Sequence, residues 1–172
     1  MGGGLTHIGD AGEARMVDVS GKETTARRAV ARARVAIGAE ALARLRAGDT
    51  PKGNVVETCR LAGIMAAKRT ADLIPLCHPI ALADVAVEVT VGDDGVVEII
   101  ASASAADRTG VEMEAMTAAA VAALTLYDML KGVTKAIEIR DVVLIEKDGG
   151  RSGRWRRGEE ARDGDRREDT AP

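Results

Sequence analysis

The sequence predicts an α+β fold in which helices cover one face of an antiparallel sheet, and three observations lead to this prediction. Residues 85–91 carry valine at every odd position, which indicates a strand, and the turn at 92–95 leads into a second strand over 96–104. Residues 110–132 form a long, mostly apolar helical pattern. The predicted order is strand, helix, helix, paired strands, long helix and strand, which is typical of ferredoxin-like folds.

The chain is predicted to divide into an arm, one domain and a tail. Residues 1–22 are mixed in character and rich in glycine, so we expect an extended N-terminal arm with one short strand. Residues 23–148 are expected to form a single α+β catalytic domain. Residues 149–172 are dominated by Arg, Asp, Glu and Gly, which predicts a flexible, charged C-terminal tail.

The first elements of the domain are a strand and a short helix. Residues 26–37 alternate partly with period two, which favours a strand with Arg32 and Arg34 on one face. Alanine and arginine also favour helix, so a helical interpretation competes with this one. Residues 39–47 are then predicted to form a short helix that Gly48 ends.

A loop and a second helix follow. Asn54 is a suitable N-cap for a helix over residues 55–68. Lys68 at the end of that helix is explained by the helix dipole alone. Lys52 has no such explanation, because it lies on a loop between Pro51 and Gly53, where a functional cation could be held.

The segment 73–80 is apolar but contains two prolines, which exclude both regular helix and sheet. Cys77 and His78 therefore lie in a rigid, irregular turn. Three interpretations stay open for His78: a pocket wall that contacts a ligand, a hydrogen-bonded core histidine, or a metal ligand. A structural zinc site needs about four ligands, and the chain has only two Cys and two His in total.

The long helix is the strongest functional signal, because it combines apolar residues with charges at both ends. Glu112 and Glu114 lie at its start, and Asp128 and Lys131 lie one turn apart at its end. Glu114 and Asp128 are about 21 Å apart along the axis, too far for one small substrate to contact both. Either the two clusters have separate roles, or a second subunit brings them together. A solvated surface pair is the structural alternative for Asp128 and Lys131.

The last predicted strand covers residues 137–139 and 142–145, as one strand or a pair, with a bulge at Arg140 and Asp141. The core must be built from Ala, Val, Leu, Ile and Met, because the chain has no Phe, one Tyr and one Trp. Such small side chains bury little area each, so we expect a homo-oligomer.

Charge and hydropathy exclude several classes of partner. The net charge of −3 gives no basic field for nucleic acid. No uncharged apolar run reaches the ~18 residues that a membrane span needs. Cys59 and Cys77 have no disulfide-framework spacing and no signal-peptide segment is evident, so a cytoplasmic protein with reduced thiols is expected. Phosphate-loop, dinucleotide-binding and serine-hydrolase motifs are absent from the sequence.

Several blocks, in order along residues 5–155, resemble the cyclic pyranopterin monophosphate synthases, the C-protein family of molybdenum cofactor biosynthesis. The blocks are Leu5-Thr6-His7-Ile8, Gly12-Glu13-Ala14, Met16-Val17-Asp18-Val19-Ser20, Lys68-Arg69-Thr70, Asp72-Leu73-Ile74-Pro75-Leu76-Cys77-His78-Pro79, Thr109-Gly110-Val111-Glu112-Met113-Glu114-Ala115 and Tyr127-Asp128-Met129.

The resemblance implies an enzyme and a reaction. Members of this family are lyases that convert 3′,8-cyclo-7,8-dihydro-GTP to cyclic pyranopterin monophosphate and release pyrophosphate. It also implies a ferredoxin-like fold and a homohexamer, a trimer of dimers with sites between subunits. No cofactor of the protein's own is implied, and any Mg²⁺ would enter with the substrate triphosphate.

The resemblance also implies roles for individual residues. Asp128, Lys131 and Lys52 fall on catalytic positions of the family pattern. The substrate-binding positions fall on Leu76, Cys77, His78, Met113, Glu114 and Lys68. Arg27 fits an arginine position in the arm, and no metal ligand is implied. We expect Asp128 and Lys131 to lie in a dry cleft between two copies of the chain, where desolvation and neighbouring lysines would lower the pKa of Lys131.

Two alternatives to this enzyme stay open. One is a non-catalytic module that binds a purine nucleotide, or assists assembly, with the same lysines. The other is a metalloenzyme that uses His7, Cys59, Cys77 and His78.

Overall fold

Residues 12–159, which the computed structural model describes, contain one sheet of five antiparallel strands. The strands are β1 (Thr25–Ala36), β2 (Leu82–Val91), β3 (Val96–Asp107), β4 (Glu138–Asp148) and β5 (Trp155–Arg156). The helices are α1 (Gly38–Ala47), α2 (Val55–Ala67), α3 (Thr70–Leu73) and α4 (Glu112–Leu130).

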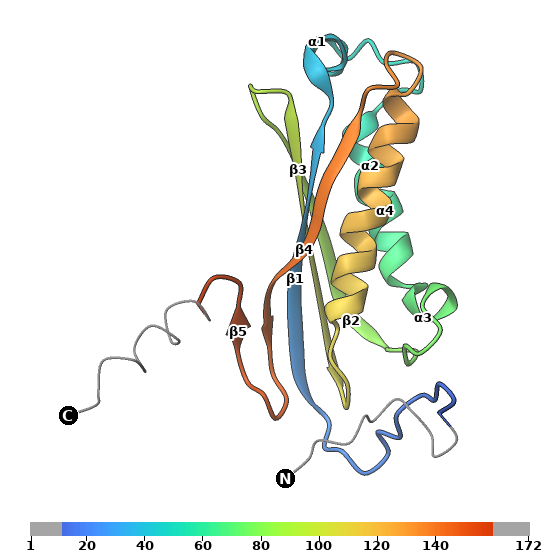
Figure 1. The fold of residues 1–172 in the computed structure, drawn as a ribbon, viewed down its shortest axis with the longest axis vertical. Coiled ribbons are helices and arrows are strands. Elements are labelled where there is room, and N and C mark those ends of the chain that lie inside the picture. The colour runs from blue at the N-terminus through green and yellow to red at the C-terminus, as the bar shows by residue number, and fades with distance from the viewer. Residues whose placement is uncertain (1–11, 160–172) are drawn as a thin grey trace, which may run out of the picture.

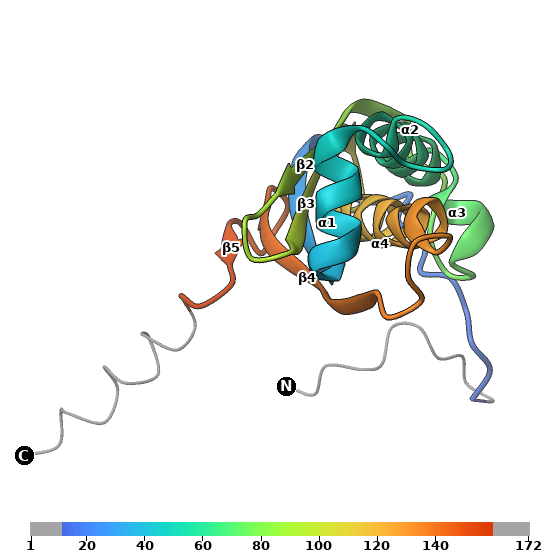
Figure 2. The same ribbon diagram turned by 90° about the horizontal axis from the view of Figure 1, so that it is seen from above.

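The helices cover one face of the sheet. Figures 1 and 2 show α2 and α4 side by side against the strands, with α1 at one end. Across the sheet the strands run in the order β2-β3-β1-β4-β5. The four long strands, with their helical connections after β1 and after β3, have ferredoxin-like topology. The predicted fold class is therefore confirmed.

β1 is the central strand, paired with β3 along its whole length and with β4 on its other side. Ala29, Ala31, Ala33 and Val35 are fully buried and belong to the core, as alternation on one face of a strand requires. The strand interpretation of residues 26–37 is thus confirmed over the helical one. Small side chains at these positions let α4 approach the sheet closely.

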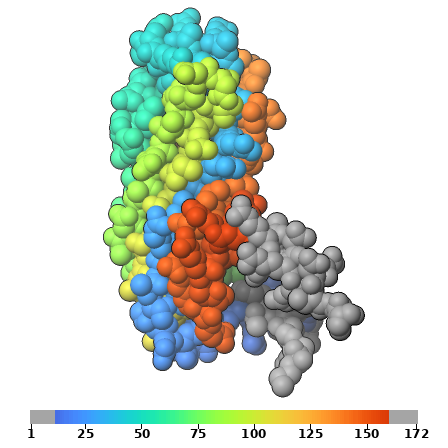
Figure 3. All heavy atoms as spheres, turned by 90° about the vertical axis from the view of Figure 1, so that its left-hand side faces the viewer, coloured from blue at the N-terminus to red at the C-terminus, as the bar shows by residue number. Residues whose placement is uncertain are grey.

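The opposite face of the sheet carries the predicted arginines. Arg34 donates from Nε to an Asp141 carboxylate oxygen at 2.7 Å, and Arg32 lies 3.8 Å from the same carboxylate. Figure 3 shows this face, on which β3, β1, β4 and β5 lie side by side at the surface. Cross-strand ion pairs between neighbouring strands thus make one side of the sheet polar while the other is core.

α4 is buried along most of its length, and many of its own buried side chains are alanines. Ala115, Ala118, Ala119, Ala122 and Ala123 are all fully buried. On α2, a Cβ at Gly63 would lie 3.0 Å from the Ala118 carbonyl oxygen, so glycine is what allows the two helices to pack this closely. The core is therefore tight but contains few large side chains.

Three local predictions are confirmed in detail. The Asn54 side chain accepts a hydrogen bond from the Glu57 N–H at 3.1 Å and so caps α2. Gly48 ends α1 in the left-handed conformation, with φ of 67°. Arg34 pairs with Asp141 and Val35 pairs with Ile139, which leaves Arg140 as the extra residue of a bulge.

The arm and the tail differ from the sequence prediction within the described residues. Residues 12–22 contain no strand, only an isolated bridge at Ala14, so the predicted short strand is not found there. The stretch predicted to be flexible after residue 149 instead turns back as β5, which pairs with β4. Arg154, just before β5, and Arg156, within it, lie 3.9 and 3.7 Å from the Glu146 carboxylate. These ion pairs attract the segment to β4, which the composition alone does not reveal.

α4 is long and apolar enough to pass a test for a membrane span by length and composition. More than half of the relevant window is buried inside the protein, and α4 packs against α2 and against β1, β3 and β4. A core helix meets the same criteria, so burial within the domain accounts for the composition of α4.

Overpacking should show how tightly α4 is fitted. Ala122→Leu adds three carbons to a fully buried position, and we expect it to lower the free energy of unfolding by about 1–3 kcal/mol. Ala39→Leu is the matched control, because Ala39 is exposed on α1 and should change stability by no more than about 0.5 kcal/mol. Urea denaturation measures both; equal effects would contradict the close packing.

Candidate active site

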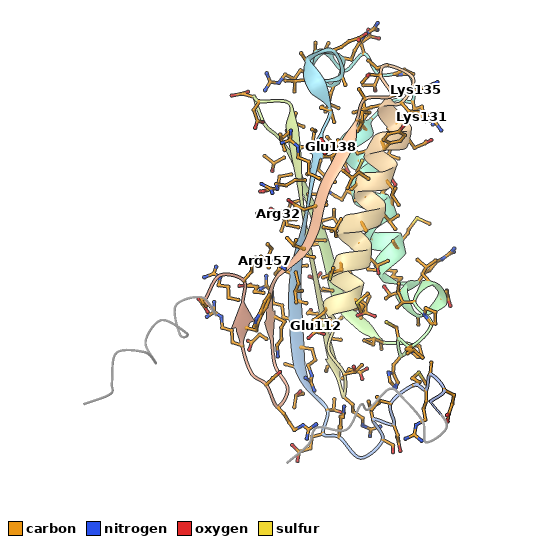
Figure 4. The ribbon with its side chains drawn as sticks, in the orientation of Figure 1. Arg32, Glu112, Lys131, Lys135, Glu138 and Arg157 are labelled. Atoms are coloured by element: carbon orange, nitrogen blue, oxygen red, sulfur yellow. The ribbon has the colours of Figure 1, made fainter. Side chains whose placement is uncertain are left out.

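The first charged cluster lies at the C-terminal end of α4. The Asp128 carboxylate accepts hydrogen bonds from Lys131, at 2.7 Å, and from Lys52 of the α1–α2 loop. The loop reaches α4 because Pro51 packs against Gly132, where a Cβ would lie 3.6 Å from the Pro51 ring. Figure 4 shows Lys131 and Lys135 at this end of the molecule. The structure thus brings the three predicted catalytic residues together.

The ion pairs shift the pKa values of Asp128 and Lys131. Hydrogen bonds from Lys131 and then Lys52 lower the pKa of Asp128 to about 2. The hydrogen bond and charge of Asp128 raise the pKa of Lys131. The Lys131 pKa is thus raised in the single chain, whereas the lowering expected in a cleft between two copies of the chain stays a prediction. The three side chains are each about half exposed, so desolvation is too weak to oppose the neighbouring carboxylate.

The second cluster lies at the other end of α4 and forms a pocket. A cavity of about 350 Å³ is lined by the segment Leu76-Cys77-His78, by the start of α4 and by the arm. Five of the six predicted substrate-binding residues line it: Leu76, Cys77, His78, Met113 and Glu114. Their grouping from two distant parts of the sequence makes this cavity the candidate substrate pocket.

His78 holds the arm against this pocket. Its Nε2 lies 2.8 Å from the Val17 carbonyl oxygen, so Nε2 carries the hydrogen and donates. Val17 and Val19 of the arm line the same cavity. His78 thus lies in the pocket wall and is hydrogen-bonded, but it is half-buried rather than part of the core, and its contact with a ligand stays a prediction.

Glu114 is the most buried charged residue in the pocket, with only 3% of its surface exposed. Its Oε2 is buried and has no hydrogen-bond partner among the described residues. Burial first, and then the charges of Glu112 and Asp107, raise the pKa of Glu114. An unpaired buried polar group costs about 1–3 kcal/mol. A ligand N–H or O–H placed against Oε2 would recover that cost.

Within the part of the chain that the structure describes, Cys59, Cys77 and His78 do not form a metal centre. Cys59 is fully buried in the core, where burial raises its pKa to about 12. Burial and the charge of Glu114 also raise the pKa of Cys77, so its thiol stays protonated at neutral pH. His7 lies outside the described residues. Across residues 12–159, no three His, Cys, Asp or Glu side chains gather as metal ligands would.

Lys68 lies in neither of the two clusters that contain the other predicted site residues. It caps the C-terminal end of α2 and is exposed, and it does not line the pocket. Figure 1 shows that α2 ends beside α3, at the same end of the molecule as the start of α4. The structure therefore separates Lys68 from Lys52 and Lys131, and a contact with substrate stays a prediction.

A basic cavity lies beside the pocket, and it was not predicted from the sequence. It measures about 800 Å³ and shares Lys22, Thr109, Gly110 and Arg151 with the pocket. Its cationic lining residues are Lys22, Arg27, Arg108 and Arg151. They lie near the start of β1, the end of β3 and the end of β4, which are neighbouring antiparallel strands. Only the sheet order reveals that these segments meet.

The two clusters do not meet within one chain. Glu114 lies in the first turn of α4 and Asp128 in its last turns, about 21 Å along the axis. The pocket offers an unpaired carboxyl oxygen, a histidine and apolar walls, next to a cationic cavity. This combination suits a small, ring-bearing anion, so the fold and the site are those of an α+β protein that binds a small anionic molecule.

Comparison with known proteins specifies the family. The model of the MoaC family matches residues 16–150, and the chain belongs to that family. A protein of Streptomyces avermitilis named cyclic pyranopterin monophosphate synthase is 56% identical over 153 residues, which are 89% of each chain. Proteins of the same name from Thermomicrobium roseum and Geobacter metallireducens are 56% and 55% identical, over 89% and 91% of this chain and 93% and 99% of theirs. The predicted family is confirmed.

Titration of Asp128 tests the first cluster. Its pKa is lower in the folded than in the unfolded chain, so the ion pairs stabilise the fold above pH ~4, and this contribution is lost as the pH falls towards 2. Carboxyl NMR should give a midpoint near pH 2 for Asp128. In Lys131→Ala the midpoint should move up towards ~3.9. A wild-type midpoint at the ordinary value would show that the contacts do not form in solution.

Proposed function

We propose that this chain is a cyclic pyranopterin monophosphate synthase, a lyase of molybdenum cofactor biosynthesis. Its substrate is 3′,8-cyclo-7,8-dihydro-GTP, and its products are cyclic pyranopterin monophosphate and pyrophosphate. Membership of the MoaC family and 56% identity to an enzyme of that name support the proposal. The observation that carries it is the gathering of Leu76, His78, Met113 and Glu114 around one pocket.

The pocket suits the ring system of this substrate. Leu76 and Met113 provide apolar cover for a ring face. The unpaired Oε2 of Glu114 accepts from ring N–H groups. The triphosphate needs cations, and the neighbouring cavity supplies a guanidinium lining in addition to the lysines expected from the sequence.

The Asp128 cluster supplies acid–base groups. Ring rearrangement moves protons on and off carbon, nitrogen and oxygen. Cyclic phosphate formation requires a hydroxyl oxygen to attack the α-phosphorus while the bond to the β-phosphate breaks and pyrophosphate leaves. Lys131 is protonated at neutral pH, so it acts as an acid and as a cation, while Asp128 orients it and accepts protons. Lys52 holds Asp128 from the other side.

The active site is composed from two chains, because one chain keeps its clusters at opposite ends of α4. A homohexamer, arranged as a trimer of dimers, places the start of α4 of one chain near the end of α4 of another. Exposed apolar side chains on α2 and α4 support such association: Leu61, Met65 and Leu124 are each more than half exposed. Closure by the second chain excludes water, which favours a lower Lys131 pKa than the single chain gives.

Further assignments follow from the same proposal. The enzyme is assigned no cofactor of its own, and any Mg²⁺ enters with the substrate triphosphate. It is assigned to the cytoplasm, with a small nucleotide-derived molecule rather than nucleic acid as its partner.

Substitution of Lys131 tests the reaction. Lys131→Ala should lower the turnover by about 10²- to 10⁴-fold, the range for general acid–base groups. The assay incubates the chain with the cyclic GTP-derived substrate and measures pyrophosphate. Lys135→Ala is the control, because Lys135 is an exposed lysine at the same end of α4 and should keep wild-type turnover.

The combination with Asp128→Ala extends this test. Because Asp128 and Lys131 are in contact, their losses should not add in the double variant. Near-wild-type turnover of Lys131→Ala would refute the assigned role. Tight binding of the substrate by the wild-type chain, without any pyrophosphate, would instead favour the non-catalytic nucleotide-binding module.

A further inference from the structure

Arg27 occupies a position where the core face of β1 extends beyond the helices. Alternation along the strand places it on the same face as Ala29, Ala31 and Ala33, which are fully buried. Its partner on β3 is Ala105, close to the end of that strand. The Arg27 side chain is therefore directed towards the turn that precedes α4, and it lines the basic cavity.

The Arg27 guanidinium fastens that turn. Nε donates to the Asp107 carbonyl oxygen at 3.3 Å, and Nη2 donates to the Arg108 carbonyl oxygen at 3.4 Å. Thr109 and Gly110, the next two residues, line both the pocket and the basic cavity. The planar fork of arginine suits two neighbouring carbonyls better than a lysine would. One side chain of β1 thus fixes a wall of the substrate pocket.

Two glycines after β4 lie against Arg27. Gly149 and Gly150 have φ of 96° and 72°, which favours glycine. A Cβ on Gly149 would overlap the Ala26 carbonyl oxygen, and a Cβ on Gly150 would overlap Nη1 of Arg27. The backbone at residue 150 thus occupies the space beside the guanidinium. A side chain there could be accommodated only if the guanidinium moved.

We propose that the Gly149–Gly150 turn is a positioning element of the active site, because it holds the Arg27 guanidinium against the Asp107 and Arg108 carbonyls and so fixes the turn into α4. Gly150 acts through Arg27 rather than on the substrate. The kinetic part of this inference rests on the proposed function. The structural part stands on the contacts alone.

Gly150→Ala tests the proposal, with Gly153→Ala as its matched control. Gly153 lies in the same connection and has φ of 59°, but a Cβ there would meet nothing within 4 Å. Both substitutions strain the backbone in the left-handed region, so they should cost similar stability. Only Gly150→Ala pushes on Arg27.

Two readouts separate positioning from stability. Hydrogen exchange of the amides of residues 108–110 should be about tenfold faster in Gly150→Ala and in Arg27→Gln, and unchanged in Gly153→Ala. In the pyrophosphate assay, Gly150→Ala should lower kcat/KM by about 10- to 100-fold, chiefly through KM, because the wall of the pocket is displaced. Once Arg27 is already Gln, Gly150→Ala should add little further loss.

The proposal is wrong if Gly150→Ala and Gly153→Ala match in hydrogen exchange. It is equally wrong if Gly150→Ala lowers kcat/KM by the same factor in the Arg27→Gln chain as it does in the wild-type chain. Turnover of the wild-type chain in the same assay tests the proposed function separately. Absence of turnover by the wild-type chain would refute the proposed function. The hydrogen-exchange comparison would still test the role of the glycine turn.

Discussion

The burial of α4 is the constraint on which the site depends. Its alanines pack against the sheet on one side and against α2 on another, and Gly63 brings α2 to within contact of the α4 backbone. A helix fixed over this length holds its two charged ends apart and in a constant relative orientation. The chemistry of the protein follows from what lies at each end, and neither end can move towards the other.

The two ends place carboxyl groups in opposite environments. Asp128 is half exposed and bonded to two lysines, so its pKa is strongly lowered. Glu114 is buried, and its Oε2 has no hydrogen-bond partner among the described residues; burial raises its pKa. Pairs of carboxyl groups whose pKa values are separated by their surroundings are a common arrangement for acid–base chemistry. Here the separation is built into one helix, and a second copy of the chain is what would bring the two kinds of group to one substrate.

Much of the fold could be predicted from the sequence because its signals are local. Alternating valines in β2, the Asn54 cap and the extra residue at Arg140 are each encoded within a few residues. The candidate pocket was predicted through the resemblance of whole sequence blocks, and the structure adds their spatial grouping. The basic cavity, Arg27 and the glycine turn depend on three strand ends that meet only in the folded sheet, which no local pattern encodes. The direction of the Lys131 pKa shift in the single chain could not be predicted from the sequence, because it depends on exposure as well as on neighbouring charge.

The proposed active site uses Asp128 and Lys131 of one chain with the Glu114 pocket of another. Mixed oligomers of Lys131→Ala and Glu114→Gln chains, formed by co-expression and purified through two different tags, test it most directly. Each variant alone should be slow, but a mixed pair contains one site in which both halves are wild type. The mixed oligomers should therefore recover a substantial part of the wild-type pyrophosphate release. Mixed oligomers as slow as either variant alone would contradict a site shared between two chains.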